Sequence, residues 1–208
     1  MRKTKRLVLS YFLILLSVSS AAAAETGYFS IKGGMFLPNS SQPGLKNFDT
    51  GYNTEVAIGY RPENYAALEL GSGYFTASGT VSNSDSRSSK TIYGIPVTLT
   101  AKAILDLEKF ELFGGAGAGY YFAVIDNRMD FFNGGIPSIQ ESSHGGALGY
   151  HLVAGGEYKV SERVRFGADF KWFVVKPELQ LTDPQNVNTK AKWDVGGAAL
   201  NVGFKYLF

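Results

Sequence analysis

The chain has no cysteine among its 208 residues. Disulfide bonds and thiolate metal sites are therefore excluded, and we expect no lipoprotein anchor, because that lipid is attached to a cysteine. Charged residues are also scarce, at 18% of the chain, where a soluble globular protein usually has about a quarter. Past residue 24, no apolar run approaches the roughly 20 residues that a membrane-spanning helix needs. A helical membrane domain is therefore not expected beyond that point.

The first 24 residues predict a secretory signal peptide. Four positive charges within residues 1–6 precede an apolar run over residues 7–18, and small residues ending in Ala-x-Ala at Ala24 follow it. A retained anchor is the alternative, but the apolar run is shorter than a spanning helix, and the alanine-rich end favours cleavage before Glu25. Removing those four charges changes the formal net charge from +2 to −2, so charge gives no reason to expect a nucleic-acid partner. We expect residues 1–24 to be cleaved and residues 25–208 to form one domain.

Residues 164–175 alternate between two different faces. Every even position is apolar, whereas the odd positions include Arg165, Asp169 and Lys171. Residues 198–208 repeat the pattern, with Asn201 and Lys205 on the less apolar face. Successive side chains of a strand point to opposite faces, so a strand of this length suits lipid on one side and a polar interior on the other.

Six more stretches share this length and alternation, which predicts an all-β, eight-stranded antiparallel up-and-down transmembrane β-barrel. The expected strands cover residues 28–37, 52–61, 65–75, 92–103, 110–122, 146–160, 164–175 and 198–208. We expect short turns at 62–64, 106–108 and 161–163, and long polar loops at 38–50, 77–90, 123–143 and 176–192. In outer-membrane barrels the short turns face the periplasm, so an even strand number would leave both ends of the mature chain there.

Aromatic residues indicate which face is outward. A soluble barrel of the lipocalin type would turn its apolar face inward. Here the apolar face carries aromatic residues near both ends of the strands, as expected at two membrane interfaces. Those near the loops are Tyr74, Tyr93, Tyr120, Phe122, Tyr150 and Trp172; those near the turns are Tyr60, Phe110, Tyr158, Tyr206 and Phe208. We therefore expect the apolar face to contact outer-membrane lipid and lipopolysaccharide.

Short motifs within these strands resemble those of small outer-membrane barrels of the OmpW type. They are residues 31–38 (Ile-Lys-Gly-Gly-Met-Phe-Leu-Pro), 95–100 (Ile-Pro-Val-Thr-Leu-Thr), 114–120 (Gly-Gly-Ala-Gly-Ala-Gly-Tyr) and the final Lys-Tyr-Leu-Phe. The alternation that ends at Phe208 also resembles the signal read by the barrel assembly machinery. OmpX-like and OmpA-like barrels share these motifs.

The OmpW resemblance implies passive binding or uptake of small hydrophobic molecules, whereas an OmpX-like barrel would be structural or adhesive, without transport. An apolar cavity would favour uptake, and strands that protrude past the membrane would favour adhesion.

Since successive side chains of a strand point to opposite faces, counting from the apolar outward positions places eleven charged residues inside the barrel. The interior of an eight-stranded barrel is just wide enough to be filled by side chains, and buried charges need partners. The near balance of signs predicts a mixed-sign network that plugs the half nearer the turns. Its members are Lys32, Glu55, Arg61, Glu69, Lys102, Glu111, Glu157, Lys159, Arg165, Asp169 and Lys205.

Nearer the loops, the inward positions are apolar. They are Phe36, Phe75, Ile92, Tyr121, Phe173 and Val175, with Pro96 just below them. We expect them to line an apolar pocket that opens outward and takes a small hydrophobic ligand. The alternative is that the aromatic rings pack against one another and leave no void.

No catalytic, metal or cofactor site is predicted. The glycines between Gly115 and Gly119 lack the spacing of a dinucleotide loop and lie within a strand. A lone inward histidine such as His151 is typical of a hydrogen-bonded lumen residue, and Ser142 and His144 lack an obvious carboxylate to orient them. We therefore expect no enzymatic activity.

Overall fold

The barrel is seen in a computed structural model that describes residues 27–39, 48–82, 84, 86–132, 138–182 and 188–208. The predicted signal peptide lies outside these residues. Eight strands form a closed antiparallel ring, and a separate two-stranded hairpin, β8–β9, precedes the last of them. The strands are β1 (Gly27–Pro38), β2 (Gly51–Glu63), β3 (Ala66–Ser82), β4 (Ser86–Leu107), β5 (Phe110–Phe131), β6 (Ile139–Lys159), β7 (Val164–Val175), β8 (Glu178–Thr182), β9 (Asn188–Lys192) and β10 (Gly197–Leu207).

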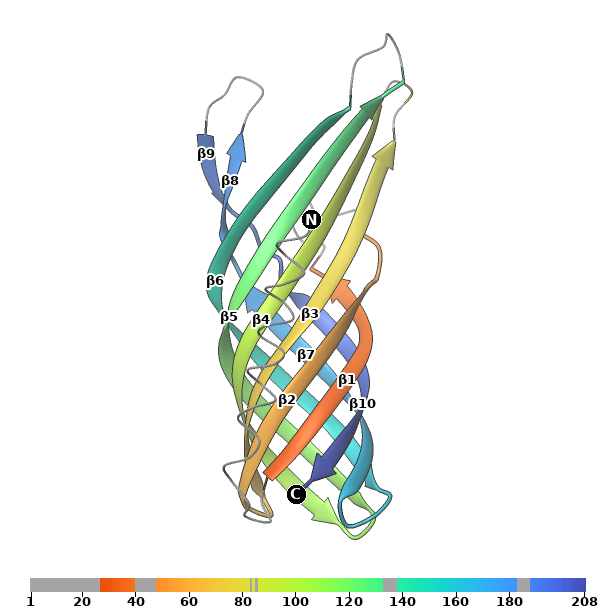
Figure 1. Ribbon diagram of the computed structural model, residues 1–208, viewed down its shortest axis with the longest axis vertical. Helices are drawn as coiled ribbons and strands as arrows, with labels where there is room; N and C mark the ends of the chain where they lie inside the picture. Colours follow the sequence, from red (N-terminus) through yellow and green to blue (C-terminus); the bar gives the residue numbers. More distant parts are fainter. Residues whose placement is uncertain (1–26, 40–47, 83, 85, 133–137, 183–187) are drawn as a thin grey trace.

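Apart from β7 and β10, which the β8–β9 hairpin separates, strands adjacent in the ring follow one another in the chain, and β10 closes the barrel by pairing with β1 (Figure 1). The backbone amide of Phe208 donates to the carbonyl of Gly27 over 2.9 Å, so the closure extends to the last residue. The predicted eight-stranded up-and-down barrel is confirmed. Among the described residues, no helix has the length and apolar character needed to cross a membrane.

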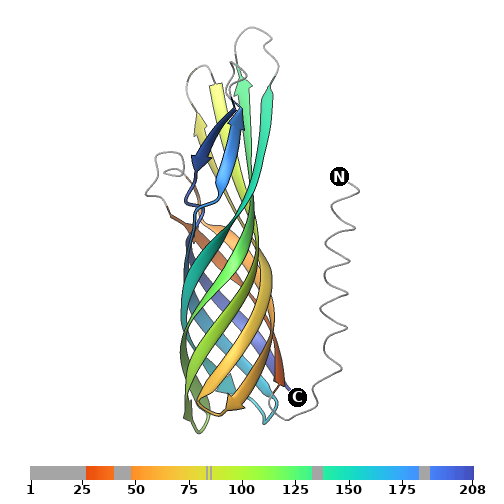
Figure 2. The same ribbon diagram turned by 90° about the vertical axis from the view of Figure 1, so that its left-hand side faces the viewer.

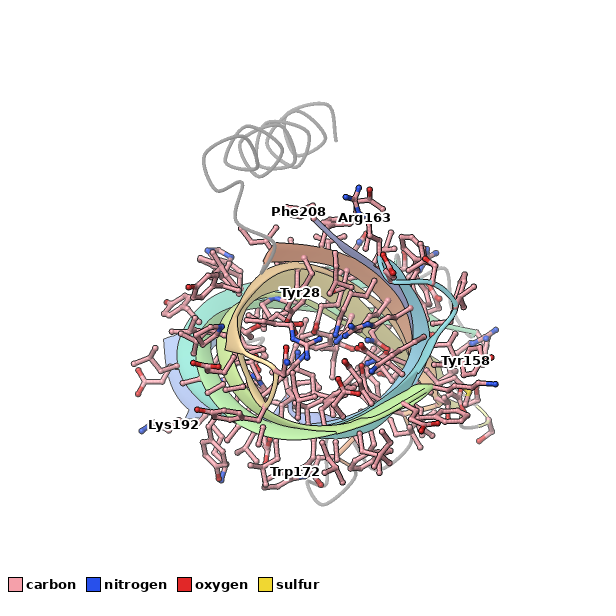
Figure 3. All side chains as sticks on the ribbon, turned by 90° about the horizontal axis from the view of Figure 1, so that it is seen from below. Tyr28, Tyr158, Arg163, Trp172, Lys192 and Phe208 are labelled. Carbon is pink, nitrogen blue, oxygen red and sulfur yellow. The ribbon has the colours of Figure 1, made fainter. Side chains whose placement is uncertain are left out.

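The two faces of the wall differ as the alternation predicts. Seen along the barrel, nitrogen and oxygen atoms gather in the lumen, while Trp172 and Tyr158 point outward (Figure 3). Apolar side chains expected near mid-membrane, such as Leu152, Phe170 and Val202, are 52%, 47% and 69% exposed. Because large apolar side chains cover the outer wall, this surface suits a hydrocarbon environment.

The strands have very different lengths. β3 to β6 contain 17, 22, 22 and 21 residues, whereas β1, β2, β7 and β10 contain 12, 13, 12 and 11. The four long strands rise past the others at the end opposite the short turns (Figures 1 and 2). We call the two ends of the barrel the turn end and the loop end. We call residues 78–82, 86–91, 126–131 and 139–148 the protruding sheet.

Two of the predicted loops are wrong. Residues 77–90 and 123–143 were expected to be polar loops, but most of them continue the ladder, from Ser78↔Thr91 to Ser82↔Arg87 and from Asp126↔Ser142 to Met129↔Ile139. Above the membrane both faces of a strand meet water, so the alternation that marks a spanning strand disappears while the backbone pairing continues. The predicted loop 176–192 contains β8 and β9, which lie beside β6.

Candidate functional site

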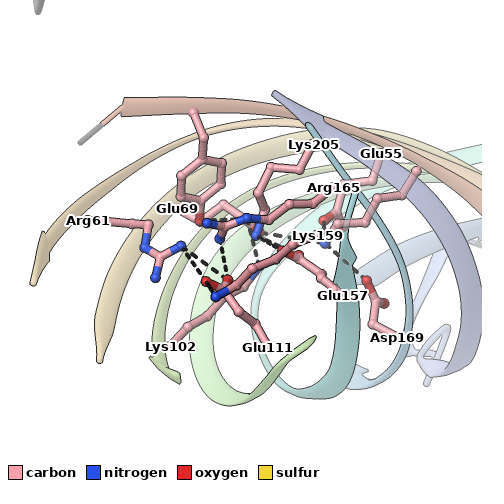
Figure 4. Close-up of polar contacts among 12 residues, drawn as sticks. Glu55, Arg61, Glu69, Lys102, Glu111, Glu157, Lys159, Arg165, Asp169 and Lys205 are labelled. Carbon is pink, nitrogen blue, oxygen red and sulfur yellow. Dashed lines mark hydrogen bonds and ion pairs between the residues drawn. The ribbon is translucent and has the colours of Figure 1, made fainter. Parts of the chain in front are cut away.

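Both halves of the lumen are filled with side chains. The structure places all eleven predicted inward charges on the lumen face of the wall, ten of them buried and Lys159 partly exposed at the turn-end rim. They come from strands on opposite walls and converge on the barrel axis, as Figure 4 shows. The half nearer the turns therefore contains an ionic network, whose role as a plug stays a prediction.

Glu111 on β5 is the centre of the cluster nearest the turn end. Its side chain is 1% exposed and accepts from Arg61 Nη1 on β2 at 3.1 Å and from Arg165 on β7. Lys159 lies 3.8 Å away and pairs with Asp106 at the rim. One buried carboxylate thus faces three cations from three strands.

Lys32 on β1 is the centre of a second cluster, closer to the middle of the barrel. Its ammonium group lies 3.1 Å from Asp169, 3.5 Å from Glu55 and 3.8 Å from Glu69. Glu69 also accepts from Lys102 at 2.6 Å. The contacts of Lys32 with Asp169 on β7 and with Glu69 on β3 join strands that are not neighbours in the barrel.

Lys171 and Tyr28 complete this second cluster, although the sequence prediction omitted both. Lys171 pairs with Glu55, and the hydroxyl of Tyr28 donates to Glu69 over 3.0 Å. Lys171 has the same parity as Arg165 and Asp169, so the alternation of β7 contained the signal needed to find it.

Nearer the loop end, the lumen holds an apolar layer. The structure turns Phe36, Phe75, Ile92, Tyr121, Phe173 and Val175 inward and buries all six, at 0–4% exposure. Phe173 lies at the centre, with its ring centroid 5.6 Å from those of Phe36 and Tyr121 and 5.3 Å from that of Phe75. Side chains this inaccessible are in close contact with their neighbours on almost all sides. The rings pack against one another, as in the alternative to a pocket, and their binding of a ligand stays a prediction.

Pro96 is half-buried beside this layer and opposite Tyr121. Proline has no amide hydrogen to donate, and the carbonyl of Pro96 accepts instead from the hydroxyl of Ser72 at 2.9 Å. Pro96 thus belongs to the wall of the barrel, and nothing tests the ligand-binding role predicted for it and its six neighbours.

Inward glycines make room for the rings. A Cβ atom built on Gly59 would lie 2.0 Å from the ring of Tyr28, and one on Gly94 would lie 2.0 Å from the ring of Phe75. Tyr121 lies over Gly149 in the same way, at 2.9 Å. Each ring therefore occupies a hollow that only a residue without a side chain can provide on the neighbouring strand.

The segment between β9 and β10 covers the apolar layer from the loop end. Val195 of this segment is fully buried, and its backbone amide donates to the carbonyl of Val175 over 3.1 Å. Asp194 accepts from the side chain of Asn39 at 3.1 Å, which ties the segment to the end of β1. Trp193 packs against the same layer beneath Lys90, whose ammonium group lies 5.5 Å from the indole ring.

The two histidines do not come together. His151 faces the lumen and is hydrogen-bonded through Nε2 to Thr100 at 2.8 Å, whereas His144 lies on the exposed outer face of β6. Among the described residues, no group of three or more His, Asp or Glu could hold a metal ion.

The chain matches the family model of the outer membrane protein beta-barrel domain over residues 8–208. No curated protein sequence matches it significantly. Among solved structures it is similar to the outer membrane protein OprG from Pseudomonas aeruginosa, with a TM-score of 0.63 and 18% identity over 88% of this chain and 96% of that one. It is also similar to Neisserial surface protein A, with a TM-score of 0.53 and 17% identity over 90% of this chain and 99% of that one.

Identities this low show the fold alone. The family match, in contrast, covers nearly the whole chain, and the closed ring, the apolar outer wall and the charged lumen agree with it. The chain belongs to the family of outer membrane protein beta-barrel domains.

Proposed function

We propose that this outer-membrane barrel acts at the cell surface, by binding a partner through its protruding sheet, and that its filled lumen does not conduct. The observation that carries the proposal is the continuation of the β3–β6 ladder past the ends of the other four strands. A paired sheet is a more rigid binding platform than separate loops of the same length. The proposal takes the loop end as extracellular, the usual orientation when one end has short turns.

The two faces of the protruding sheet differ in chemistry. On the outer face, hydroxyl groups pair across strands, Ser78 with Thr91 at 3.1 Å and Thr80 with Ser89 at 3.3 Å. The lumen-side face carries exposed apolar side chains near its tip, where Val81 and Ile139 are 46% and 49% exposed; they lie in one cross-strand row with Met129 and with the polar Ser88. Exposed apolar side chains at the end of a rigid sheet are typical of a protein-binding surface.

The edges of the protruding sheet provide a second means of binding. Among the described residues above Thr76, β3 pairs with β4 on one side, and on its other side it is joined by the bridge of Phe48 to Gly79. An unpaired strand edge can accept an extended segment of another protein by strand addition. The partner that this geometry fits is therefore a protein surface with an extended segment and an apolar contact.

Trimming the protruding sheet tests the proposal. Replacing residues 79–90 by Asn-Gly and residues 127–141 by Asn-Gly leaves the pairs Ser78↔Thr91 and Asp126↔Ser142 closed by two-residue turns. The apolar layer and the ionic network stay intact. Cells displaying the wild-type barrel should be retained on laminin, on fibronectin or on a lawn of the same cells, and cells displaying the trimmed barrel should not. Equal retention would overturn the proposal.

Uptake of small hydrophobic molecules is the alternative, and it requires the apolar layer to open. Entry of the fluorescent probe N-phenylnaphthylamine into the same cells distinguishes the two functions. Uptake above that of cells lacking the barrel, unchanged by trimming, would support a conduit. A large steady ionic conductance of the wild-type protein in a planar bilayer would also contradict the filled lumen, because it requires a continuous water column.

A further inference from the structure

Three cations lie side by side on the lumen face near the turn end. The register pairs Lys159 on β6 with Arg165 on β7, and Arg165 with Lys205 on β10. Ser30 on β1 continues the row as the partner of Lys205. Like charges directly opposite one another destabilise a sheet, so this row needs negative charge from elsewhere in the lumen.

Each cation of the row has a carboxylate partner, but Arg165 shares its partner, Glu111, with Arg61. The ion pairs of the network, among the described residues, join seven cations to six carboxylates: Lys32, Arg61, Lys102, Lys159, Arg165, Lys171 and Lys205 to Glu55, Glu69, Asp106, Glu111, Glu157 and Asp169. Leaving out the partly exposed rim pair of Lys159 and Asp106 removes one charge of each sign. Either way one positive charge remains in excess within this network, and the carboxylate that balances it among the buried described residues, Asp194, lies away from it at the loop end.

A small cavity lies beside this row, and two polar atoms on its lining lack a protein partner. The cavity has room for about one water molecule and is lined by Ser30, Arg165 and Lys205, together with Lys32, Glu157 and Asp169. Arg165 Nε and Ser30 Oγ are buried without a hydrogen-bond partner among the described residues. The Nε–H of arginine can only donate, and a serine hydroxyl can donate too. The missing partner is therefore an acceptor.

We infer that this cavity is a binding site for one small monovalent anion, with chloride as the ligand of the right size and charge. Three of the charged lining residues are cations and two are carboxylates, so the lining has the same excess of one positive charge as the whole network. We take Arg165 Nε and Ser30 Oγ, which belong to two residues that line the cavity, as the donors to this anion. Phosphate and carboxylate ligands are excluded, because the space holds only about one water molecule.

Crystals grown with sodium bromide in place of chloride test the site, because bromide is identified by its anomalous scattering. Urea unfolding of the wild-type barrel in sodium bromide and in sodium gluconate, at equal ionic strength, gives the second readout. We expect an anomalous peak in contact with Arg165 Nε and Ser30 Oγ. We also expect bromide at twice its Kd to favour the folded state about threefold over gluconate.

Ser30→Ala should remove most of this salt difference. Thr100→Ala, which removes a buried lumen hydroxyl that does not line the cavity, should keep it. A cavity that contains ordered water and gives no anomalous peak would overturn the inference. A peak with equal wild-type stability in the two salts would mean an adventitious ion only, and would overturn it too. Neither measurement depends on what the protruding sheet binds.

Discussion

The two halves of the lumen are occupied by side chains that make different kinds of contact. The turn half holds charges whose contacts are directional, such as Lys32 to Asp169 at 3.1 Å. The loop half holds rings in contact, such as Phe36 and Phe75 with centroids 4.9 Å apart. Removing one charge leaves its partners buried and uncompensated, whereas removing one ring leaves a cavity. Each half of the lumen thus has its own weak point.

The weak point of the charged half is the carboxylate that the most cations share. Glu111→Gln should lower the free energy of unfolding by about 3–5 kcal/mol, because it leaves Arg61 and Arg165 buried without their anion. Urea unfolding in lipid vesicles measures the loss.

Asp106→Asn is the matched control for this change. Asp106 pairs with Lys159 where its side chain is 40% exposed, so solvent screens the pair and the cost should stay below about 1 kcal/mol. Equal losses for the two variants would mean that water reaches the whole network and that the lumen is open at the turn end.

The comparison of the two halves holds only if odd positions of β7 face the lumen and even ones face lipid. Phe170→Arg should cost about 2–4 kcal/mol, because it places a charge on the outer wall near mid-membrane. Ser84→Arg, at an exposed position between β3 and β4, should cost almost nothing. If refolding stability fell equally for both, the assignment of faces would be wrong.

The weak point of the aromatic half is the hollow under each ring. Gly94→Ala should cost about 1–3 kcal/mol, because the added Cβ would lie 2.0 Å from the ring of Phe75 and the packed layer leaves that ring nowhere to move. Gly114→Ala makes the same chemical change on the outer wall, where nothing lies within 4 Å, and it should be neutral.

Adding Phe75→Ala to Gly94→Ala should cost less than the sum of the two single changes, because it removes the clash. Additive losses would show that Gly94 is needed for its backbone and not for the space above it.

The sequence was sufficient for the parts of the fold that touch lipid. Every spanning strand was found, and the same parity placed Glu111 and Arg165 in the lumen, because contact with lipid imposes an alternation that can be read without a structure. It also implied Lys171, which the prediction omitted.

Two features depend on relations that the sequence does not display. The extensions of β3 to β6 have polar residues on both faces, so no period of two marks them. Whether Phe75 and Phe173 enclose a pocket or fill the lumen depends on the cross-strand register. The register sets Gly94 under Phe75, and parity alone cannot show that pairing.

A substitution at the tip of the protruding sheet should have the smallest effect on stability. The same substitution should have the largest effect on the proposed function. Ile139→Ser should change the free energy of unfolding by no more than about 0.5 kcal/mol, because the side chain is already 49% exposed and packs against little. Retention of displaying cells should nevertheless fall, because the apolar row with Val81 and Met129 loses its outermost member.

Gln140→Ser is the control for this last change. It alters the neighbouring residue of the same strand, on the exposed outer face, by a similar loss of volume. It should leave both stability and retention unchanged. If retention fell equally for both variants, binding would depend on the strand edge, which both residues share, and the apolar row would have no special part in it. If retention fell for neither, the contact would lie elsewhere on the protruding sheet.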